Sequence, residues 1–282
     1  MESKPFTESD IKPVVKWVGG KRQLIGELTN LMPRNYNRYY EPFFGGGALY
    51  FATKPNNAVI NDINHDLITM YRVIKDKPLE LISLLEKHSQ NHSKDYYYKL
   101  RSFDRDGSID EMNDIEKSAR LLYMLRVDFN GLYRVNSKGQ FNVPYGRYKN
   151  PNIVNKNTIL AVSSLFKHNN VELKSVDFAK AINGIKKNDF VYFDPPYIPL
   201  TPTASFTSYT ANGFNYDEQE RLRDLFFSLK ERGVFAMLSN SDTPLTRELY
   251  EGANFHVVKA KRAINSNAKK RGQVNELIIT NY

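Results

Sequence analysis

The sequence predicts an α/β fold: a mostly parallel sheet with helices on both faces and an antiparallel pair of strands at its end. Short β-branched or aromatic segments alternate with amphipathic segments at both ends of the chain, as in sheets built from β–α–β units. Hydrophobic residues make up 41% of the 282 residues, enough for a substantial core. The last two strand-like segments are joined by the polar, basic stretch 264–273. Because a parallel pair needs a crossover, usually a helix, these two strands should pair antiparallel.

The predicted strands are short and rich in β-branched or aromatic residues. They are Asn37–Phe44, Ala58–Asn61, Val171–Val176, Phe190–Phe193, Val234–Ser239, Phe255–Ala260 and Leu277–Thr280. Amphipathic or helix-prone segments between them predict helices over Lys21–Leu31, Ala48–Thr53 and Asp217–Lys230, the last stopped by Gly233. Thr243-Pro244 is typical of a helix start and Gly252 of a helix end.

Residues 67–156 interrupt this rhythm. They contain three amphipathic segments, Leu67–Lys75, Pro78–His88 and Ile115–Val127, and then a stretch at 129–151 punctuated by Gly, Asn and Pro. The segment could be extra helical cover for the sheet or an inserted domain. Its length, and the return of strands after it, favour the insertion. The predicted domains are therefore 1–66 with 157–282, and 67–156.

The composition limits the classes of partner and of site that this chain can have. Forty Lys and Arg against 31 Asp and Glu give a net charge of +9, which favours a polyanionic partner such as nucleic acid. Without cysteine there is no disulfide, thiolate metal site or cysteine nucleophile. The five histidines form no cluster of metal-ligand spacing, so no metal is expected. No apolar run is long enough to span a membrane, and the N-terminus lacks a signal peptide, so we expect a soluble, cytoplasmic protein.

A glycine-rich turn, Glu41-Pro42-Phe43-Phe44-Gly45-Gly46-Gly47, follows the first predicted strand and opens a helix. Consecutive glycines let the backbone approach a ligand closely. Asp62 ends the second strand, where a carboxylate can accept the hydroxyls of a ribose. Together they suit a nucleoside-containing cofactor without a pyrophosphate; an ordinary tight turn with a surface aspartate is the alternative.

Asp194-Pro195-Pro196-Tyr197 follows the buried strand Phe190–Phe193, at the sheet edge where ligands of α/β proteins bind. The Asp194 carboxylate and the Pro195 carbonyl are hydrogen-bond acceptors on a backbone stiffened by two prolines. Tyr197 adds a flat ring. Two acceptors and a ring suit a planar aromatic amine, because its two N–H groups can be accepted while the heterocycle stacks on the phenol. A proline-rich loop without a ligand is the alternative.

Asp194–Tyr197, the Glu41–Gly47 turn and Lys16–Lys21 together closely resemble the Dam-type DNA adenine-N6 methyltransferases, which act at GATC. The likeness runs from about residue 14 to 282 and is greatest to the Dam-like enzymes of streptococcal restriction–modification systems. The order of glycine turn, insertion and Asp-Pro-Pro-Tyr matches the α group of amino methyltransferases. The resemblance implies a Rossmann-like class I methyltransferase sheet that uses S-adenosylmethionine, with a mainly helical, inserted DNA-recognition domain carrying a β-hairpin.

Residue by residue, the resemblance implies two sets of contacts within the catalytic domain. The set expected to bind S-adenosylmethionine consists of Trp17, Lys21, Glu41, Phe43, Gly45, Asp62, Asp177, Phe178 and Asp194. Within it, Phe43 and Gly45 belong to the turn beside the methionine moiety, and Asp177-Phe178 hold and stack the adenine. Asp194, Pro195 and Tyr197 would grip the target adenine. Taken alone, Trp17 could equally be a core residue and Lys21 the solvated first turn of a helix.

Basic and aromatic residues alternate in 126–149, a pattern that suits reading of a DNA groove, although a solvated loop with aromatic anchors is the alternative. This stretch resembles the recognition hairpin of the family. By that resemblance Phe129 wedges at the flipped-out base, Leu132 and Arg134 read inner bases, Arg147 meets the backbone or flank, and Lys16 contacts the first guanine. Asn130 and Asn142 complete the expected DNA contacts. A second basic cluster, expected to clamp phosphates, consists of Lys259, Lys261, Arg262, Lys269, Lys270 and Arg271.

The predicted reaction is transfer of a methyl group from S-adenosylmethionine to N6 of an adenine flipped out of double-stranded DNA, by direct displacement. The absence of cysteine excludes methylation at C5 of cytosine, which needs a thiolate. Methylation of cytosine N4, methylation of RNA or of a protein glutamine, and a DNA-binding regulator without turnover stay open as alternatives. A monomer is expected, with a dimer left open.

Overall fold

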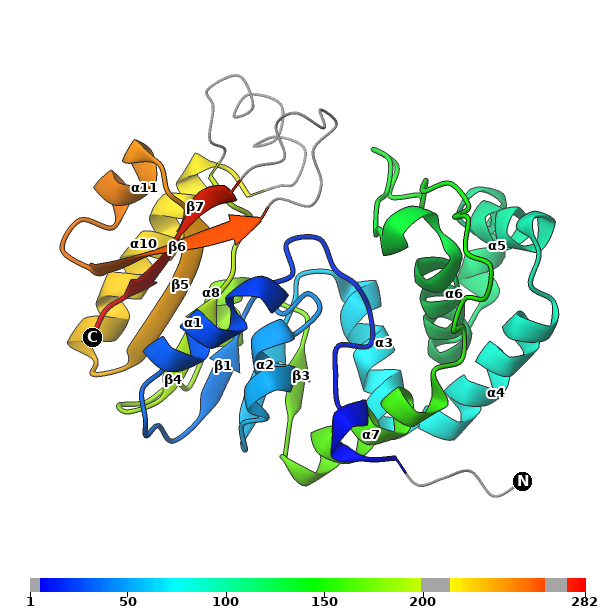
Figure 1. The fold of residues 1–282 in the computed structure, drawn as a ribbon, viewed down its shortest axis with the longest axis horizontal. Coiled ribbons are helices and arrows are strands. Elements are labelled where there is room, and N and C mark those ends of the chain that lie inside the picture. The colour runs from blue at the N-terminus through cyan, green and yellow to red at the C-terminus, as the bar shows by residue number, and fades with distance from the viewer. Residues whose placement is uncertain (1–5, 199–213, 262–272) are drawn as a thin grey trace. The chain divides into compact units, whose positions relative to one another are not determined.

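The computed structural model describes residues 6–198, 214–261 and 273–282. The chain forms two compact units, each described here by itself (Figure 1). Unit 1 comprises Met1–Gly20, Gly45–Lys54 and Asn64–Ser175, and unit 2 comprises Lys21–Phe44, Pro55–Ile63 and Val176–Tyr282. The predicted division into domains at 66/67 and 156/157 stays a prediction.

Unit 2 is built on a sheet. Its strands are β1 (Tyr39–Glu41), β2 (Ala58–Asn61), β4 (Phe190–Phe193), β5 (Phe235–Ser241), β6 (Asn254–Lys261) and β7 (Gln273–Thr280). They lie in the order β2-β1-β4-β5-β7-β6. Neighbours from β2 to β5 pair parallel, whereas β7 pairs antiparallel with both β5 and β6. The expected mixed sheet with an antiparallel final pair is thus confirmed.

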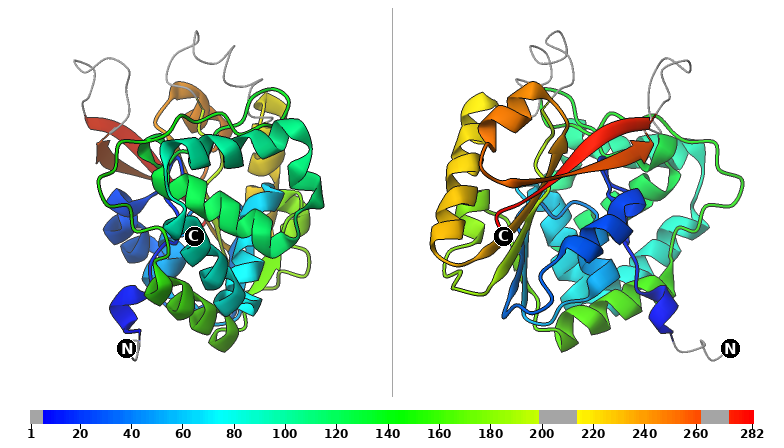
Figure 2. Two further views of the ribbon diagram at one scale, coloured as in Figure 1. Left: turned by 90° about the vertical axis from the view of Figure 1, so that its right-hand side faces the viewer. Right: turned by 60° about the vertical axis from the view of Figure 1, so that its left-hand side comes forward.

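Alternate strand residues point to opposite faces of this sheet. Val191 and Phe193 face a buried apolar cluster that includes Leu222 and Phe226 of α10 (Tyr216–Glu231). In Figures 1 and 2, α10 lies on one face of the sheet and α1 (Ile25–Leu31) on the other. Such cover on both faces leaves the ends of the strands as the place where polar loops can carry chemistry.

Local signals explain the helix boundaries in unit 2. Asn215 caps α10, and the Thr243 side chain accepts a hydrogen bond from the backbone of α11 (Pro244–Leu249), as the Thr-Pro pair predicts. The predicted helix over 21–31 is partly wrong, because its first turn is the 3₁₀ helix η2 (Arg22–Leu24) and Lys21 is its cap. A short helix that the sequence pattern does not predict, α8 (Phe178–Ala181), is capped by Asp177.

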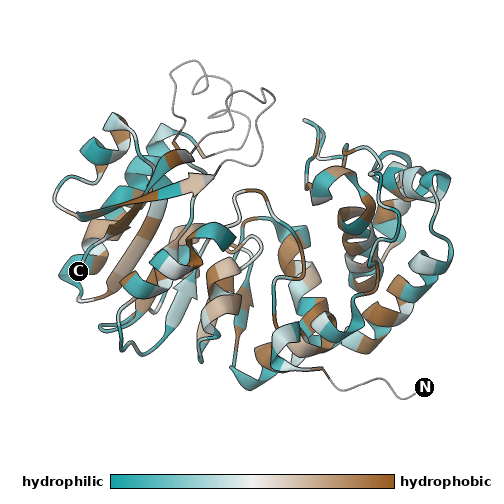
Figure 3. Cartoon of the chain, viewed as in Figure 1, coloured by the Kyte–Doolittle hydropathy of each residue, from teal (hydrophilic) through white to brown (hydrophobic). Residues whose placement is uncertain are grey.

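Unit 1 is mainly helical. It contains η1 (Glu8–Asp10), α2 (Ala48–Thr53), α3 (His65–Asp76), α4 (Pro78–Gln90), α5 (Lys94–Asp106), η3 (Ser108–Glu111), α6 (Asp114–Val127), η4 (Phe129–Gly131), α7 (Lys156–His168) and the strand β3 (Glu172–Lys174). α3 packs against α4, α6 and α7. α4 carries both hydrophobic and hydrophilic residues, as expected for a helix with one buried stripe (Figure 3).

Two helices of unit 1, α5 and α7, lie where the sequence analysis assigns none. α5 is polar on average and buries only Tyr97 and Leu100, so it offers few of the aliphatic residues from which the sequence analysis assigns helices. β3 is also shorter than the predicted strand Val171–Val176. None of the helices in the described ranges has the length and apolar character that crossing a bilayer demands.

The expected β-hairpin is not present as strands. In 128–151 the structure shows η4 and two isolated antiparallel bridges, Asp128–Tyr145 and Val135–Phe141, which turn the chain back on itself. The backbone of Asn142 does pair with that of Arg134, through an N–H···O bond of 3.0 Å. The segment from Asp128 to Tyr148 is called the recognition loop below.

Candidate active site and DNA-reading loop

The loop Asp194–Tyr197 leaves the carboxyl end of β4, in the centre of the sheet of unit 2. Two buried side chains hold it there. Gln219 of α10 donates from Nε2 to the Pro196 carbonyl at 2.9 Å, and Asn240 of β5 accepts the Ile198 N–H at 3.0 Å. Gln219 and Asn240 are themselves buried. The loop is therefore fixed by its neighbours as well as by its prolines.

Three of the predicted site residues meet directly. Lys21 Nζ lies 2.8 Å from Asp194 Oδ1 and 4.5 Å from the centre of the Tyr197 ring. Lys21 is only 8% exposed, so this ammonium is a buried partner of the carboxylate and not a solvated helix residue. Its contact with the aromatic ring adds a cation–π interaction. The alternative of Lys21 as the solvated first turn of a helix is thus wrong.

Opposing effects act on the pKa of the Asp194 carboxyl. Burial raises its pKa, the Lys21 ammonium opposes this rise, and the Glu276 carboxylate adds to it. A carboxylate with a buried cation beside it can stay ionised, and an ionised carboxylate is the stronger hydrogen-bond acceptor. The environment of Asp194 therefore suits an acceptor that does not itself exchange a proton during a reaction.

Glu276 of β7 was not among the predicted site residues. The Tyr197 hydroxyl donates to Glu276 Oε2 at 3.0 Å, and burial raises the pKa of Tyr197 well above its ordinary value. The phenol therefore stays protonated and keeps this hydrogen bond. Glu276 thereby fixes the ring of Tyr197 from a strand that is 79 residues away in sequence.

A buried asparagine organises the segments predicted to bind the cofactor. Asn61, at the end of β2, donates from Nδ2 to the carbonyls of Pro42 and Val176 and accepts the Val176 N–H at Oδ1. The Asn61 carbonyl accepts the Phe44 N–H at 2.8 Å. One side chain thus joins the glycine-turn segment, the strand that precedes Asp62, and the segment that precedes Asp177. A polar residue as the last position of an apolar strand was the only sequence signal for it.

The Phe178 ring lies between an aromatic and a charged side chain. The Phe178 ring is buried, stacks on Phe43 at a centroid distance of 5.4 Å, and lies 4.4 Å from the Arg221 guanidinium. Arg221 also pairs with the Asp177 carboxylate. The structure thus brings Phe43, Asp177 and Phe178 together, and it adds Arg221, which the sequence analysis does not include. Glu41 is buried too and accepts the Tyr39 hydroxyl at 2.7 Å.

Three further residues are predicted to bind the cofactor. Asp62 follows β2 in unit 2 and is half-buried, whereas Trp17 and Gly45 belong to unit 1. A Cβ atom on Gly45 would lie 2.7 Å from Trp17 Cδ1, and Gly45 has a φ of +49°, so this position requires glycine. The Trp17 ring also stacks on Tyr133 of the recognition loop, at a centroid distance of 5.0 Å. Trp17 is half-buried, so it is not a pure core residue.

The residues predicted to contact DNA share one property: all are exposed or half-exposed in unit 1. They are Lys16, Phe129, Asn130, Leu132, Arg134, Asn142 and Arg147. Phe129 is the most unusual, because 52% of a large apolar side chain faces solvent. Arg134 is held in place: its Nε donates to Asn142 Oδ1 at 2.6 Å and its Nη2 to the Asn142 carbonyl at 3.2 Å.

Asp128 begins the recognition loop and is fully buried. Its Oδ1 accepts the Leu132 N–H at 3.1 Å, whereas its Oδ2 has no hydrogen-bond partner in the described part of the chain. Burial raises the pKa of this carboxyl to about 8. The aspartate thus shapes the turn Phe129–Leu132 as a largely protonated acid at neutral pH.

Comparison with known proteins decides the family. The model of the D12 class of N6 adenine-specific DNA methyltransferases matches residues 17–264. The chain belongs to this family. It is 55% identical to the Type II methyltransferase M1.LlaDCHI of Lactococcus lactis subsp. cremoris, over 97% of this chain and 96% of the relative. It is 40% identical to the Type II methyltransferase M.MjaIII of Methanocaldococcus jannaschii, over 97% and 100% of the two chains. It is 33% identical to the DNA adenine methylase of Escherichia coli K12, over 94% and 93%.

Membership of the D12 class makes the chain a DNA adenine methyltransferase with DNA as its substrate. No cluster of three or more His, Asp or Glu side chains that could hold a metal occurs within 6–198, 214–261 and 273–282. Of the second predicted basic cluster, Lys259 is exposed on β6. Arg262, Lys269, Lys270, Arg271 and the side chain of Lys261 lie outside the described residues.

Proposed function

We propose that this methyltransferase transfers the methyl group of S-adenosylmethionine to N6 of adenine in GATC sites of double-stranded DNA, after flipping the adenine out of the helix. The observation that carries the proposal is the fixed loop Asp194–Tyr197 at the end of β4, whose carboxylate and phenol ring both contact Lys21 Nζ. GATC is proposed from the resemblance to Dam-type enzymes and from relatives named DNA adenine methylase.

The chemistry of unit 2 fits S-adenosylmethionine. The Lys21 ammonium suits the carboxylate of the methionine moiety, and Asp62 suits the ribose hydroxyls. Phe43 and Phe178 form an apolar aromatic pair suited to the adenine, with Asp177 beside them. Glu41, the buried last residue of β1, stays a predicted cofactor contact. Trp17 and Gly45 of unit 1 stay predicted cofactor contacts. The bound cofactor supplies a methyl group made electrophilic by a positive sulfur.

Asp194 and the Pro195 carbonyl are proposed to accept the two N–H bonds of the target amine, while Tyr197 stacks on the purine. Accepting both hydrogens directs the nitrogen lone pair out of the ring plane, where it can attack the methyl carbon. A C–N bond forms as the C–S bond breaks, and N6 then loses a proton. In the structure Lys21 Nζ lies beside the same carboxylate, so Asp194 must serve Lys21 and the amine together or exchange one for the other. Catalysis comes from alignment of these acceptors.

Lys16, Phe129, Asn130, Leu132, Arg134, Asn142 and Arg147 are proposed to contact DNA. We also infer that the chain is the methyltransferase of a type II restriction–modification system, because two relatives are named Type II methyltransferases. A monomer is sufficient if each strand of a palindromic site is modified in a separate visit.

The test is to incubate the purified protein with isotope-labelled S-adenosylmethionine and a duplex containing GATC, and to identify the modified nucleosides by mass spectrometry. Labelled N6-methyladenine in that duplex, and much less in a duplex with one base pair of the site exchanged, is the expected result. Labelled N4-methylcytosine, or binding of DNA without transfer, would overturn the proposal.

A further inference from the structure

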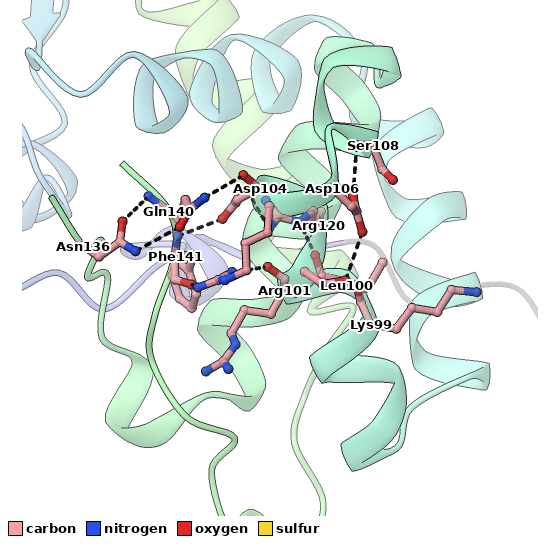
Figure 4. Close-up of polar contacts among 12 residues, drawn as sticks. Lys99, Leu100, Arg101, Asp104, Asp106, Ser108, Arg120, Asn136, Gln140 and Phe141 are labelled. Atoms are coloured by element: carbon pink, nitrogen blue, oxygen red, sulfur yellow. Dashed lines mark hydrogen bonds and ion pairs between the residues drawn. The ribbon is translucent and has the colours of Figure 1, made fainter. Parts of the chain in front are cut away.

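The recognition loop contains no strand, so something other than a sheet must hold it in shape. Its backbone is held by helix α5 (Figure 4). Both the Tyr97 hydroxyl and Arg101 Nη1 donate to the Val143 carbonyl, at 2.8 and 3.0 Å. Arg105 Nη2 donates to the Phe141 carbonyl at 2.8 Å. These three donors lie four residues apart along α5 and therefore share one face of the helix.

Asp104 completes this clamp from the same helix. Its Oδ2 accepts the Phe141 N–H at 2.8 Å, and its backbone carbonyl accepts from Gln140 Nε2 at 3.3 Å. Figure 4 shows Asp104 reaching toward Gln140 and Phe141, with Arg120 beside it. Phe141 therefore has both of its backbone polar groups bonded to side chains of α5.

Arg120 of α6 holds Asp104 in turn. Its Nη2 lies 2.8 Å from Asp104 Oδ1, and its Nε donates to the Leu100 carbonyl at 2.7 Å. Arg120 is buried and Asp104 nearly so. A buried ion pair of this kind fixes geometry strongly, because loss of either partner leaves an uncompensated charge. The ion pair with Arg120 therefore fixes the position of the Asp104 carboxylate, which bonds the recognition loop.

The two residues that α5 bonds, Phe141 and Val143, flank Asn142 in the sequence, and Asn142 in turn bonds Arg134. Phe141 precedes Asn142 and Val143 follows it, so α5 fixes the backbone on both sides. Asn142 accepts two hydrogen bonds from the Arg134 guanidinium and donates its N–H to the Arg134 carbonyl. Reading of a base edge by arginine depends on the direction of the guanidinium. That direction is set here by Asn142, whose own backbone is set by α5.

We propose that Asp104, held by Arg120, is a specificity-positioning residue: it acts through Phe141 and Asn142 to set Arg134 for reading DNA. Asp104 does not itself contact DNA in this proposal. The inference rests on the proposed function, since it requires Arg134 to read a base pair.

The test measures discrimination between DNA sites. A pool of duplexes methylated by the wild type first defines the preferred site, and kcat/KM is then measured on that site and on duplexes with single base pairs exchanged. Arg134→Ala identifies the pair that Arg134 reads. We expect Asp104→Ala to reduce discrimination at the same pair by about tenfold, within the range for loss of one base contact. The double variant, Asp104→Ala with Arg134→Ala, should discriminate no worse than Arg134→Ala alone, because Asp104 acts through Arg134.

Asp106→Ala is the matched control, because this exposed carboxylate on the same helix bonds, among the described residues, only to Ser102 and Ser108. Its discrimination should equal that of the wild type. Asp104→Asn, which keeps an acceptor for the Phe141 N–H but loses the charge that Arg120 needs, should fall between the wild type and Asp104→Ala. It serves as the test if Asp104→Ala does not fold.

Unchanged discrimination in folded Asp104→Ala or Asp104→Asn, with only a lower Tm, would overturn the inference in favour of a purely structural role. Losses that multiply in the double variant would overturn it as well. A wild type that transfers no methyl group, or an Arg134→Ala variant that discriminates like the wild type, would instead show that the proposed function has failed.

Discussion

Two aspartates begin the two loops on which the proposed reaction depends, and they have different partners. Asp128 is fully buried, whereas Asp194 is 19% exposed with a buried Oδ1 atom. Asp194 opens the catalytic loop of unit 2 and has a buried lysine 2.8 Å away. Asp128 opens the recognition loop of unit 1 and has only backbone N–H partners, with no ion pair among the described residues. Burial raises the pKa of both carboxyls.

The difference separates a carboxyl kept for chemistry from one kept for shape. A cation beside Asp194 favours the ionised form, which accepts hydrogen bonds from a ligand. Asp128 has no ion pair among the described residues, and the attraction of the Lys16 charge does not offset its burial, so Asp128 retains a proton and supports the turn that follows it. Burial alone is therefore a poor guide to function: the partner of the buried acid decides which role it can take.

The largest expected effect is at Asp194. Asp194→Ala removes the proposed acceptor of the target amine, and we expect kcat to fall by at least about a hundredfold, as when one charge-aligning group is lost from an active site. DNA binding should survive, because the residues proposed to contact DNA belong to unit 1. Methyl transfer and fluorescence anisotropy measure the two separately. Asp224→Ala, an exposed carboxylate on α10, is the control, and near-wild-type turnover of Asp194→Ala would refute the assigned role.

The next largest effect is expected from closing the space beside Asp128. A Cβ atom at Gly146 would lie 2.5 Å from the Asp128 carbonyl oxygen and 2.8 Å from that of Val127, and backbone atoms cannot swing aside. Gly146→Ala should distort the recognition loop, at an overpacking cost of about 1–3 kcal/mol. We expect DNA affinity to fall by roughly ten- to a hundredfold, since each factor of ten corresponds to about 1.4 kcal/mol.

Gly26→Ala is the matched control for this glycine, because nothing lies within 4 Å of the added Cβ atom in α1. DNA affinity measured by anisotropy should be unchanged in that variant. If Gly146→Ala binds DNA as the wild type does, the shape of the loop start does not matter for DNA binding.

Asp128→Asn tests the comparison by pH. The folded carboxyl holds its proton up to about pH 8, whereas its ordinary value of 3.8 applies once the chain unfolds. Between pH 4 and pH 8 the folded state binds more protons than the unfolded state. The contribution of the protonated Asp128 carboxyl to the free energy of unfolding is therefore complete below pH 4 and is lost as the pH rises through 8. Between pH 4 and pH 8 the free energy of unfolding of the wild type should therefore fall by up to ~1.4 kcal/mol per pH unit relative to Asp128→Asn.

Urea unfolding at a series of pH values measures this difference. Asp110→Asn, on an exposed carboxylate of η3, is the control for the loss of one carboxyl group. Parallel curves for Asp128→Asn and the wild type would mean that Asp128 is ionised in the folded protein and that the contrast with Asp194 is wrong.

The catalytic loop could be predicted from sequence because its parts are local. An apolar strand followed by Asp-Pro-Pro-Tyr places Asp194 at the end of β4, whichever strands flank it. The residues that hold the loop could not be predicted. Gln219, Asn240 and Glu276 come from α10, β5 and β7, and only the completed sheet brings them to Pro196, Ile198 and Tyr197.

The recognition loop shows the opposite balance. Its basic and aromatic residues predict what it contacts, but its shape depends on α5, a polar helix that the sequence analysis does not assign. The hairpin predicted by resemblance is realised as two isolated bridges. Backbone bonds across the loop involve Arg134, Asn136, Gln140 and Asn142, whereas side chains of α5 bond the backbone of Phe141 and Val143. Local patterns do not reveal such side-chain support.

The smallest expected effect concerns how the catalytic loop is supported. Glu276→Gln replaces the carboxylate that accepts the Tyr197 hydroxyl, and Tyr197→Phe removes the hydroxyl itself while keeping the ring. A hydrogen bond to a charged group contributes about 1.5–3 kcal/mol, and the amide oxygen of Gln retains part of this. We therefore expect either change to lower kcat by about tenfold with little change in KM, because the ring still stacks but is less fixed.

A double-variant cycle separates this role from a general electrostatic one. If Glu276 acts only through the hydroxyl of Tyr197, Glu276→Gln has no further effect on kcat once Tyr197→Phe is present. If Glu276 acts instead on the charge of Asp194, whose pKa it raises, the two effects multiply and the pH dependence of kcat shifts. Glu220→Gln, on an exposed face of α10, controls for the loss of one negative charge. Effects that multiply would show that Glu276 acts through the charge of the Asp194 carboxylate. The role of Asp194, like that of Asp128, would then be set by burial and by neighbouring charges.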